Sequence, residues 1–423
     1  MDGRADIHFG NSHPKQGPDA PIGAVALNLD QERAWLPATR TLEQGETITV
    51  GGVEIQAFHA VTDTEDSMTF WLPEKKIVID NVVWPTIPNI YTLRGDRYRP
   101  PMLWAQALKD IRDLHPEIVL SVGGGSTTLR GADFIQEALT ALIDTISFLY
   151  DQTIRLTNQG IPPYELANHI SVPENMASHP FVNEAYGQFE HHLPRIVGVN
   201  SGWFSGRGED LHHLPRAVQA ENLIKLAGGA AKVMDAYKDA MNKSQYLWAK
   251  ELATYLYYSD NSNVEYRQAL ADTFRILGQY SPGAIARNFF TASARSLEGD
   301  KSFTLGKVQR ADWVKADHAR AVNHLRTRIN PQLASGHEGV MQFDIDGTVV
   351  ALHIRNSIAE FVASPDRHYR APDAYIKVTG DDFTAYFRGE MNASELLQKA
   401  EVSGDAAPLL GVLDAFEHIP MYP

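Results

Sequence analysis

The chain of 423 residues contains no cysteine. Disulfide bonds and thiolate metal sites are therefore excluded, and any metal ion must be bound by His, Asp or Glu. Basic residues are also in short supply, because the net charge is −14 and no run of Lys and Arg is present. A nucleic-acid-binding surface needs clustered cations, so the sequence argues against nucleic acid as a partner.

Long apolar runs are missing as well. No apolar segment reaches the roughly 18 residues that suggest a membrane span, so none is predicted. The first residues, from Met1 to Gly17, are polar and lack the apolar region of a signal peptide. The expected compartment of the chain as written is the cytoplasm, or the periplasm if the true N-terminus lies upstream.

The length predicts two or three domains, each large enough for its own core. Residues 1–131 have the pattern of an α/β layer, in which strands precede a helix and a further strand. Gly51-Gly52 has the form of a hairpin turn between two alternating strands. The expected elements are strands at 48–50, 53–55, 68–72, 77–79 and 117–121 and a helix at 103–114.

Residues 132–300 show apolar residues at helical spacing almost throughout. Gly160 stands where a helix C-terminal cap belongs, and Pro162-Pro163 suits the opening of the next helix. The segment predicts antiparallel helix pairs. A scaffold or a dimerisation surface is the ordinary role of such a bundle.

Residues 311–423 predict a small α+β domain. Two alternating runs on either side of Asp346-Gly347 predict a hairpin. The expected strands are at 340–345, 350–354, 375–378 and 383–387, and the expected helices at 316–329, 395–400 and 408–416.

Residues 80–95 bring two opposite charges together at short spacing. Asp80 ends an apolar strand, and Asn89, Thr92 and Arg94 follow in a loop stiffened by two prolines. A carboxylate suits a cation, while a planar guanidinium suits two oxygens of an anion such as sulfate. The pairing is typical of a metal-assisted hydrolase of oxyanion esters, although an ordinary surface loop has the same pattern.

The run Phe58–Asp80, in which Thr62-Asp63-Thr64 precedes an apolar strand, resembles the second half of a metallo-β-lactamase fold. That superfamily has a His where this chain has Asp63, and an acid there resembles its alkylsulfatase branch. Several further runs resemble the same branch in the same order. They are residues 89–95, 151–160, Tyr186-Gly187, His192, Arg195, 202–206, Gly228-Gly229 and 287–289. The chain is identified as a member of that branch.

The resemblance implies a fold of three parts. Residues 1–131 would be part of a metallo-β-lactamase αββα sandwich, and residues 132–300 a helical dimerisation domain. Residues 311–423 would be a sterol-carrier-like domain. The family reaction is the metal-dependent hydrolysis of alkyl sulfate esters to alcohol and sulfate. The implied partners are an alkyl sulfate or other amphipathic small molecule and a second copy of the chain.

The resemblance also assigns site residues. A binuclear zinc centre in the family would draw on Asp63, or on Glu65 of the same loop, and on Asp80. The sulfate group would contact four positions, which are Asn89, Thr92, Arg94 and Tyr186.

Departures from the family pattern leave two hypotheses open. The family's His-x-His-x-Asp-His motif is expected upstream of this chain, so half of the sandwich would be absent. Gly124 falls where the last metal-binding His is expected, and Pro88 replaces a His that precedes the substrate-loop Asn. One hypothesis is a metal-dependent sulfuric-ester hydrolase whose missing metal ligands come from an upstream segment or from another chain. The alternative is a non-catalytic relative that serves as a dimerisation and lipid-binding module.

His8 and His13 lie in the run HFGNSHP near the N-terminus. Their spacing in a proline-bearing loop matches no metal-ligand pattern. Neither is predicted as a site residue.

Overall fold

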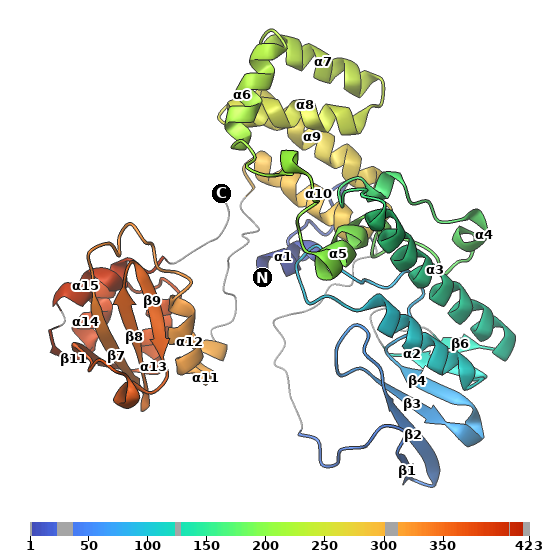
Figure 1. Ribbon diagram of the computed structural model, residues 1–423, viewed down its shortest axis with the longest axis horizontal. Helices are drawn as coiled ribbons and strands as arrows, with labels where there is room; N and C mark the ends of the chain where they lie inside the picture. Colours follow the sequence, from blue (N-terminus) through green and yellow to red (C-terminus); the bar gives the residue numbers. More distant parts are fainter. Residues whose placement is uncertain (1, 23–36, 123–127, 301–311, 406, 418–423) are drawn as a thin grey trace. The chain divides into compact units, whose positions relative to one another are not determined.

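A computed structural model describes residues 2–22, 37–122, 128–300, 312–405 and 407–417 (Figure 1). The chain divides into two compact units, Gly3–Phe303 and Thr304–Pro423. Two sheets and many helices make up these units, so the predicted mixed α/β, α and α+β fold class is confirmed. No helix in the described ranges is long and apolar enough to cross a membrane.

The first unit begins with a six-stranded sheet in the order β1-β2-β3-β4-β5-β6. Its neighbouring strands are antiparallel except for β4 and β5, which are parallel and joined through helix α2, Pro101–Asp113. The strands are β1 Thr47–Val50, β2 Val53–His59, β3 Met68–Leu72, β4 Ile77–Asp80, β5 Ile118–Ser121 and β6 Thr128–Arg130. The predicted hairpin is confirmed, because Val50 pairs with Val53 and both glycines between them have positive φ.

Helices α2 and α3, the latter Ala132–Asn158, pack against each other beside this sheet. Trp104 and Leu108 of α2 are fully buried, and α3 buries an apolar stripe that includes Leu139 and Leu142. Helix α2 follows β4 and α3 follows β6 in the chain. Because both helices are held by their buried apolar faces, the ends of the loops that connect them to the strands are fixed in place. Residues 81–100, the loop after β4, are held in this way.

Helices dominate residues 132–300, as predicted. The longer helices after α3 are α5 Phe189–Ser201, α6 Arg216–Leu226, α7 Ala230–Asn242, α8 Tyr246–Ser259, α9 Val264–Tyr280 and α10 Ala284–Leu297. Gly160 follows the end of α3 with positive φ, as expected of a helix cap. The helix predicted to open at Pro162-Pro163 is absent. The chain forms only a 3₁₀ turn there, Leu166–Asn168, and this turn already places Leu166 in the core.

The N-terminal segment packs on α10. Helix α1 covers Asp2–His8, and the side chain of Asn288 donates a hydrogen bond to the His8 carbonyl at 3.0 Å. The His13 ring lies 3.1 Å from the Asn288 carbonyl, and Asp19 forms an ion pair with Arg275 of α9. These contacts fix the backbone that carries His8.

The second unit contains a five-stranded sheet in the order β11-β10-β7-β8-β9. The strands are β7 Gly339–Ile345, β8 Thr348–Arg355, β9 Ile358–Val362, β10 Ala374–Val378 and β11 Glu401–Gly404. The helices are α11 Asp312–Ala316, α12 His318–Leu325, α13 Gly380–Phe387, α14 Ala393–Lys399 and α15 Ala407–Asp414. Strands β9 and β11 were not predicted. The helix expected at 316–329 is shorter, because α12 begins after Asp317, whose side chain caps it, and ends at Leu325.

The strand predicted at 383–387 was wrong, because these residues belong to α13. The side chain of Thr379 accepts a hydrogen bond from the Asp382 amide and caps the first turn. Phe383, Tyr386 and Phe387 then lie at helical spacing, and all three are buried in the core of the unit. An aromatic-rich run of five residues suits either a strand or a helix face, and the cap together with burial decides for the helix.

Candidate functional site

The loop after β4 is buried and tied down at both ends. Thr92 and Asn89 are almost completely inaccessible to solvent. The Ile87 amide and the Thr86 hydroxyl both donate to the Asn183 carbonyl, which links the loop to the helical part of the unit. The part of the predicted substrate loop from Ile87 to Thr92 is therefore largely internal, whereas Asp96 and Arg97 are exposed.

Four side chains from three distant parts of the chain meet at this loop, and we call them the Arg94 cluster. They are His8, Thr92, Arg94 and Tyr186. The His8 ring lies 2.8 Å from the Tyr186 hydroxyl through Nε2 and 3.2 Å from the Thr92 hydroxyl through Nδ1. Arg94 Nη1 lies 3.4 Å from both His8 Nε2 and Thr92 Oγ1. Three of the four predicted sulfate-contacting residues are thus brought together, with His8 in the middle.

Burial makes the cluster rich in neutral hydrogen-bonding groups. Burial, with the charges of Arg94 and Arg99, lowers the pKa of His8 to about 3, so its ring is neutral at ordinary pH. Burial also raises the pKa of the Tyr186 hydroxyl, which stays protonated. A neutral imidazole, two hydroxyls and a guanidinium form a set that can hold an oxyanion.

Two carboxylates balance the two guanidiniums at the site. Arg94 forms an ion pair with Asp96 at 2.6 Å. Arg99 is 6% exposed; it forms an ion pair with Asp63 at 2.9 Å and lies 3.6 Å from Asp96. Arg99 also donates to the Asn89 carbonyl at 2.6 Å, so it joins the loop of Asp63 to the substrate loop. With His8 neutral, this group of residues carries no net charge.

Asn89 is placed differently from the other three predicted sulfate contacts. Its side-chain Oδ1 is buried and has no hydrogen-bond partner. Behind it lies His192, fully buried, with both ring nitrogens unpartnered. A Cβ at Gly187 would lie 3.1 Å from His192 Nε2, so a larger residue there would require the His192 ring to shift by a few tenths of an ångström. Burial lowers the pKa of His192 to about 3.

The predicted metal ligands Asp63 and Asp80 differ in their surroundings. Asp80 is buried; its Oδ1 accepts the amides of Val82 and Val83 at 2.7 and 2.8 Å, and its Oδ2 has no partner. Burial raises the pKa of Asp80 to about 6, against the opposing effect of those hydrogen bonds. The carboxylate of Asp63 is occupied by Arg99, which competes with a cation.

The described residues do not fit a binuclear zinc centre. No group of three or more His, Asp or Glu side chains able to hold a metal ion occurs within the described ranges. Glu65, the alternative ligand in the Asp63 loop, forms an ion pair with Arg97 at 3.0 Å. Gly124 lies outside the described residues.

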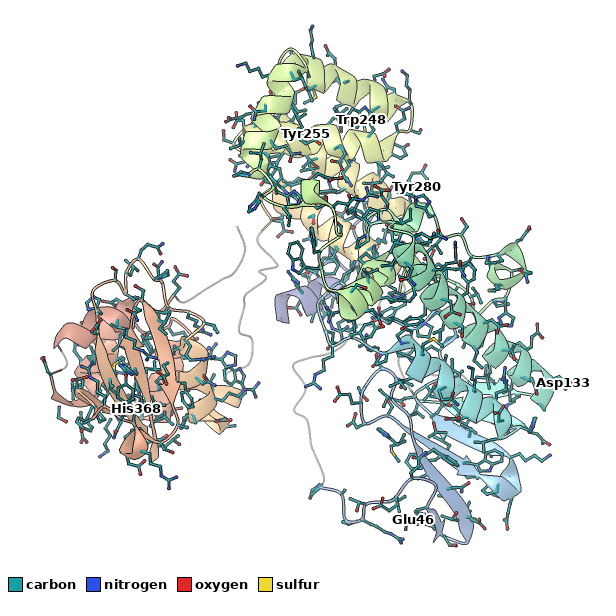
Figure 2. The ribbon with its side chains drawn as sticks, in the orientation of Figure 1. Glu46, Asp133, Trp248, Tyr255, Tyr280 and His368 are labelled. Atoms are coloured by element: carbon teal, nitrogen blue, oxygen red, sulfur yellow. The ribbon has the colours of Figure 1, made fainter. Side chains whose placement is uncertain are left out.

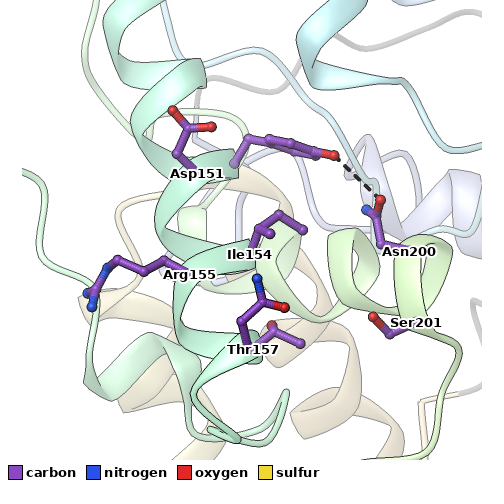
Figure 3. Close-up of a pocket in the computed structure, with 8 residues that line it drawn as sticks. Asp151, Ile154, Arg155, Thr157, Asn200 and Ser201 are labelled. Carbon is purple, nitrogen blue, oxygen red and sulfur yellow. Dashed lines mark hydrogen bonds between the residues drawn. The ribbon is translucent and has the colours of Figure 1, made fainter.

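A hollow of about 550 Å³ opens between α3 and α5 (Figure 3). Most of the residues that line it are polar, and the Tyr150 hydroxyl donates to Asn200 Oδ1 across it at 3.4 Å. Arg155 lines it and is engaged by Gln152 at 2.7 Å. None of the residues of the Arg94 cluster contributes to its lining.

The sequence did not predict His8 or Arg99 as site residues, nor the burial of His192. His8 is 84 residues from Thr92 and 178 from Tyr186, so no local spacing connects it to them. Arg99 gave a weak signal, since it follows Arg94 by five residues in a proline-rich loop. His192 was noted in a family-like run, but its burial depends on the packing of α5.

Comparison with known proteins relates the chain to alkylsulfatases. Residues 162–300 match the alkyl sulfatase dimerisation family. A linear primary-alkylsulfatase of Pseudomonas sp. is 28% identical over 99% of this chain and 82% of its own length. An alkyl/aryl-sulfatase of Saccharomyces cerevisiae is 25% identical over 70% of this chain and 46% of its own length. Over nearly its whole length the chain is similar to alkylsulfatases.

The fold of this alkylsulfatase-like chain also has a solved counterpart. The stereoselective inverting sec-alkylsulfatase Pisa1 from Pseudomonas sp. superimposes with a TM-score of 0.78 and 20% identity. The match covers all of this chain and 68% of that protein. Nothing in these comparisons favours the non-catalytic alternative over an alkylsulfatase-like function.

Proposed function

We propose that this chain binds alkyl sulfate esters, with the sulfate group at the Arg94 cluster, as part of a sulfuric-ester hydrolase. The convergence of Arg94, Thr92, His8 and Tyr186 carries the proposal. The guanidinium fork and the hydroxyl groups suit sulfate oxygens. The proposal includes Asn89 as a further donor to the anion, through its side-chain NH₂ group.

Hydrolysis is the second part of the proposal. The relatives are named as sulfatases, and the chain resembles them over most of its length. The proposed hydrolysis includes no metal-dependent step, because the described residues do not form a zinc site.

A homodimer and an amphipathic ligand complete the proposal. Tyr280 at the end of α9 stacks on Tyr246 at the start of α8, where Leu247 and Trp248 are exposed. We call these four residues the α8–α9 patch; Trp248 and Tyr280 are labelled in Figure 2. Its place inside the dimerisation family match supports a second copy as its partner. The sterol-carrier-like role of residues 311–423, with an alkyl chain as ligand, stays a proposal.

Binding of decyl sulfate by isothermal titration calorimetry tests the first part. The Arg94→Gln variant should lose most of the affinity, because the anion loses its guanidinium. Arg97→Gln is the matched control, since Arg97 lies in the same loop, is 81% exposed and pairs with Glu65 instead. Equal affinities of the two variants would contradict the proposal.

Release of inorganic sulfate, measured by ion chromatography, tests the second part. The full chain is assayed after treatment with a chelator and again after addition of Zn²⁺. Release that depends on zinc would support a metal-dependent hydrolase. No release under either condition would remove catalysis from this polypeptide and leave the binding proposal to calorimetry.

A further inference from the structure

Asp96 lies beside the Arg94 cluster and is not among the proposed sulfate contacts. Its Oδ2 is 2.6 Å from Arg94 Nη2 and 3.6 Å from Arg99 Nη2. Its Oδ1 accepts the Arg97 amide at 2.8 Å, which fixes the carboxylate on its own loop. Asp96 therefore occupies one side of the guanidinium fork that an oxyanion would use.

The Asp96 carboxyl group is ionised at neutral pH. Burial acts to raise the pKa of Asp96, but the Arg97 amide and the charges of Arg94 and Arg99 outweigh it and hold the pKa below its usual range. The surrounding charged groups are paired. Arg99 is shared with Asp63, Arg97 with Glu65, and His8 is neutral. An incoming anion therefore meets a site without excess positive charge.

We propose that Asp96 is a specificity-determining residue that restricts the Arg94 cluster to singly charged oxyanion esters. This inference rests on the proposed function. Repulsion between Asp96 and a bound anion grows in proportion to the ligand's charge. A sulfate monoester carries one negative charge, whereas a phosphate monoester carries close to two above its second pKa of about 6. The doubled charge of the phosphate ester doubles its repulsion from Asp96 and its attraction to Arg94 alike. Because the charges of Arg94 and Arg99 are offset by Asp96 and Asp63, the dianion gains no net attraction, while its desolvation costs more than that of a monoanion.

The geometry also explains how a single charge is accepted. Nη1 of Arg94 makes only long contacts of 3.4 Å, with His8 and Thr92, while Nη2 donates to Asp96 at 2.6 Å. A monoanion can replace the two long contacts and leave the Asp96 pair in place. A dianion needs further positive charge, and the nearest source, Arg99, is already engaged by Asp63 and the Asn89 carbonyl.

Three ligands with the same tail test this at about pH 8 by calorimetry on the full chain. They are decyl sulfate, decyl methyl phosphate and decyl phosphate, and the first two carry one charge each. We expect the first two to bind with similar affinity and decyl phosphate to bind roughly tenfold more weakly. A higher salt concentration should reduce the difference in affinity between decyl sulfate and decyl phosphate in the unmodified chain. Arg94 and Asp96 are partly exposed, so dissolved ions screen their charges.

The Asp96→Asn variant should strengthen decyl phosphate binding roughly tenfold and that of the two monoanions only about threefold. Asp239→Asn, on α7 in an exposed pair with Lys243, changes net charge equally and should leave all three affinities unchanged. Equal affinities of the unmodified chain for the three ligands, or equal gains in Asp96→Asn, would overturn the inference alone. Absence of decyl sulfate binding would overturn the proposed function and this inference together. If Asp96→Asn does not fold, the salt dependence of the three affinities decides the question.

Discussion

His8 shows how a residue of ordinary sequence context acquires a role by burial. Its ring is neutral because burial and two nearby guanidiniums disfavour the imidazolium. A neutral ring can accept a hydrogen bond at one nitrogen and donate at the other. His8 can therefore orient the hydroxyls of Tyr186 and Thr92 without adding charge to the site.

Replacing His8 with Phe keeps a ring of similar size but removes both hydrogen bonds. We expect decyl sulfate binding to weaken roughly tenfold, the effect of one or two hydrogen bonds. A double-mutant cycle with Tyr186→Phe, measured by calorimetry, tests whether the two residues act together. Additive effects of the two substitutions would contradict the positioning role.

Asp80 should make stability depend on pH. Its folded pKa is raised to about 6, so the protonated form stabilises the fold; this stability is complete below the unfolded pKa and is lost as the pH rises through about 6. Relative to Asp80→Asn, the unmodified chain should gain about 2 kcal/mol in unfolding free energy between about pH 7 and about pH 4. Urea unfolding with a chelator present measures this difference. A difference that does not change with pH would show that Asp80 is not buried in this way.

At the scale of elements, caps and burial decide where short aromatic runs go. Residues 383–387 alternate no better than they repeat at helical spacing, so local pattern leaves strand and helix open. The Thr379 cap and the acidic first turn, Asp381 and Asp382, favour the helix. The same reasoning applies to α14, which starts with a capping box between Asn392 and Glu395.

Removal of the α13 cap should destabilise the second unit. Thr379→Ala removes the acceptor for the Asp382 amide, and we expect a loss of about 1 kcal/mol in unfolding free energy. Thr379→Ser keeps the acceptor and serves as the control. Hydrogen exchange of the backbone amides of β7 and β8, measured in urea, reports on this unit, because both strands contribute to its core. Equal losses in the two variants would argue against capping.

At the scale of the whole molecule, the two units have separate cores. The second unit buries a cluster that includes Phe343, Phe383 and Phe416, while the first has its own clusters around Trp104 and Leu252. The first unit places an apolar patch at its surface, at the start of α8 and the end of α9. Exposed patches of this kind mark association surfaces.

Placing a charge in the α8–α9 patch should break a dimer formed through it. We expect Leu247→Glu to shift the molar mass measured by light scattering from dimer toward monomer, because a buried carboxylate without a partner is costly. Leu333→Glu is the matched control, since Leu333 is exposed on the second unit. A dimer that persists in Leu247→Glu would place the interface elsewhere on the chain.

The sequence by itself determined the element types over most of the chain, the Gly51-Gly52 hairpin and the alkylsulfatase relationship, because these follow from local periodicity, turn chemistry and motif order. It also marked Thr92, Arg94 and Tyr186. Tertiary structure alone decided that these three meet around His8, since the contact spans 178 residues and depends on α1 packing against α10. It also decided that Asp63 pairs with Arg99 and that Asp96 occupies the Arg94 fork, because the choice of partner for a charged group is set by burial and geometry.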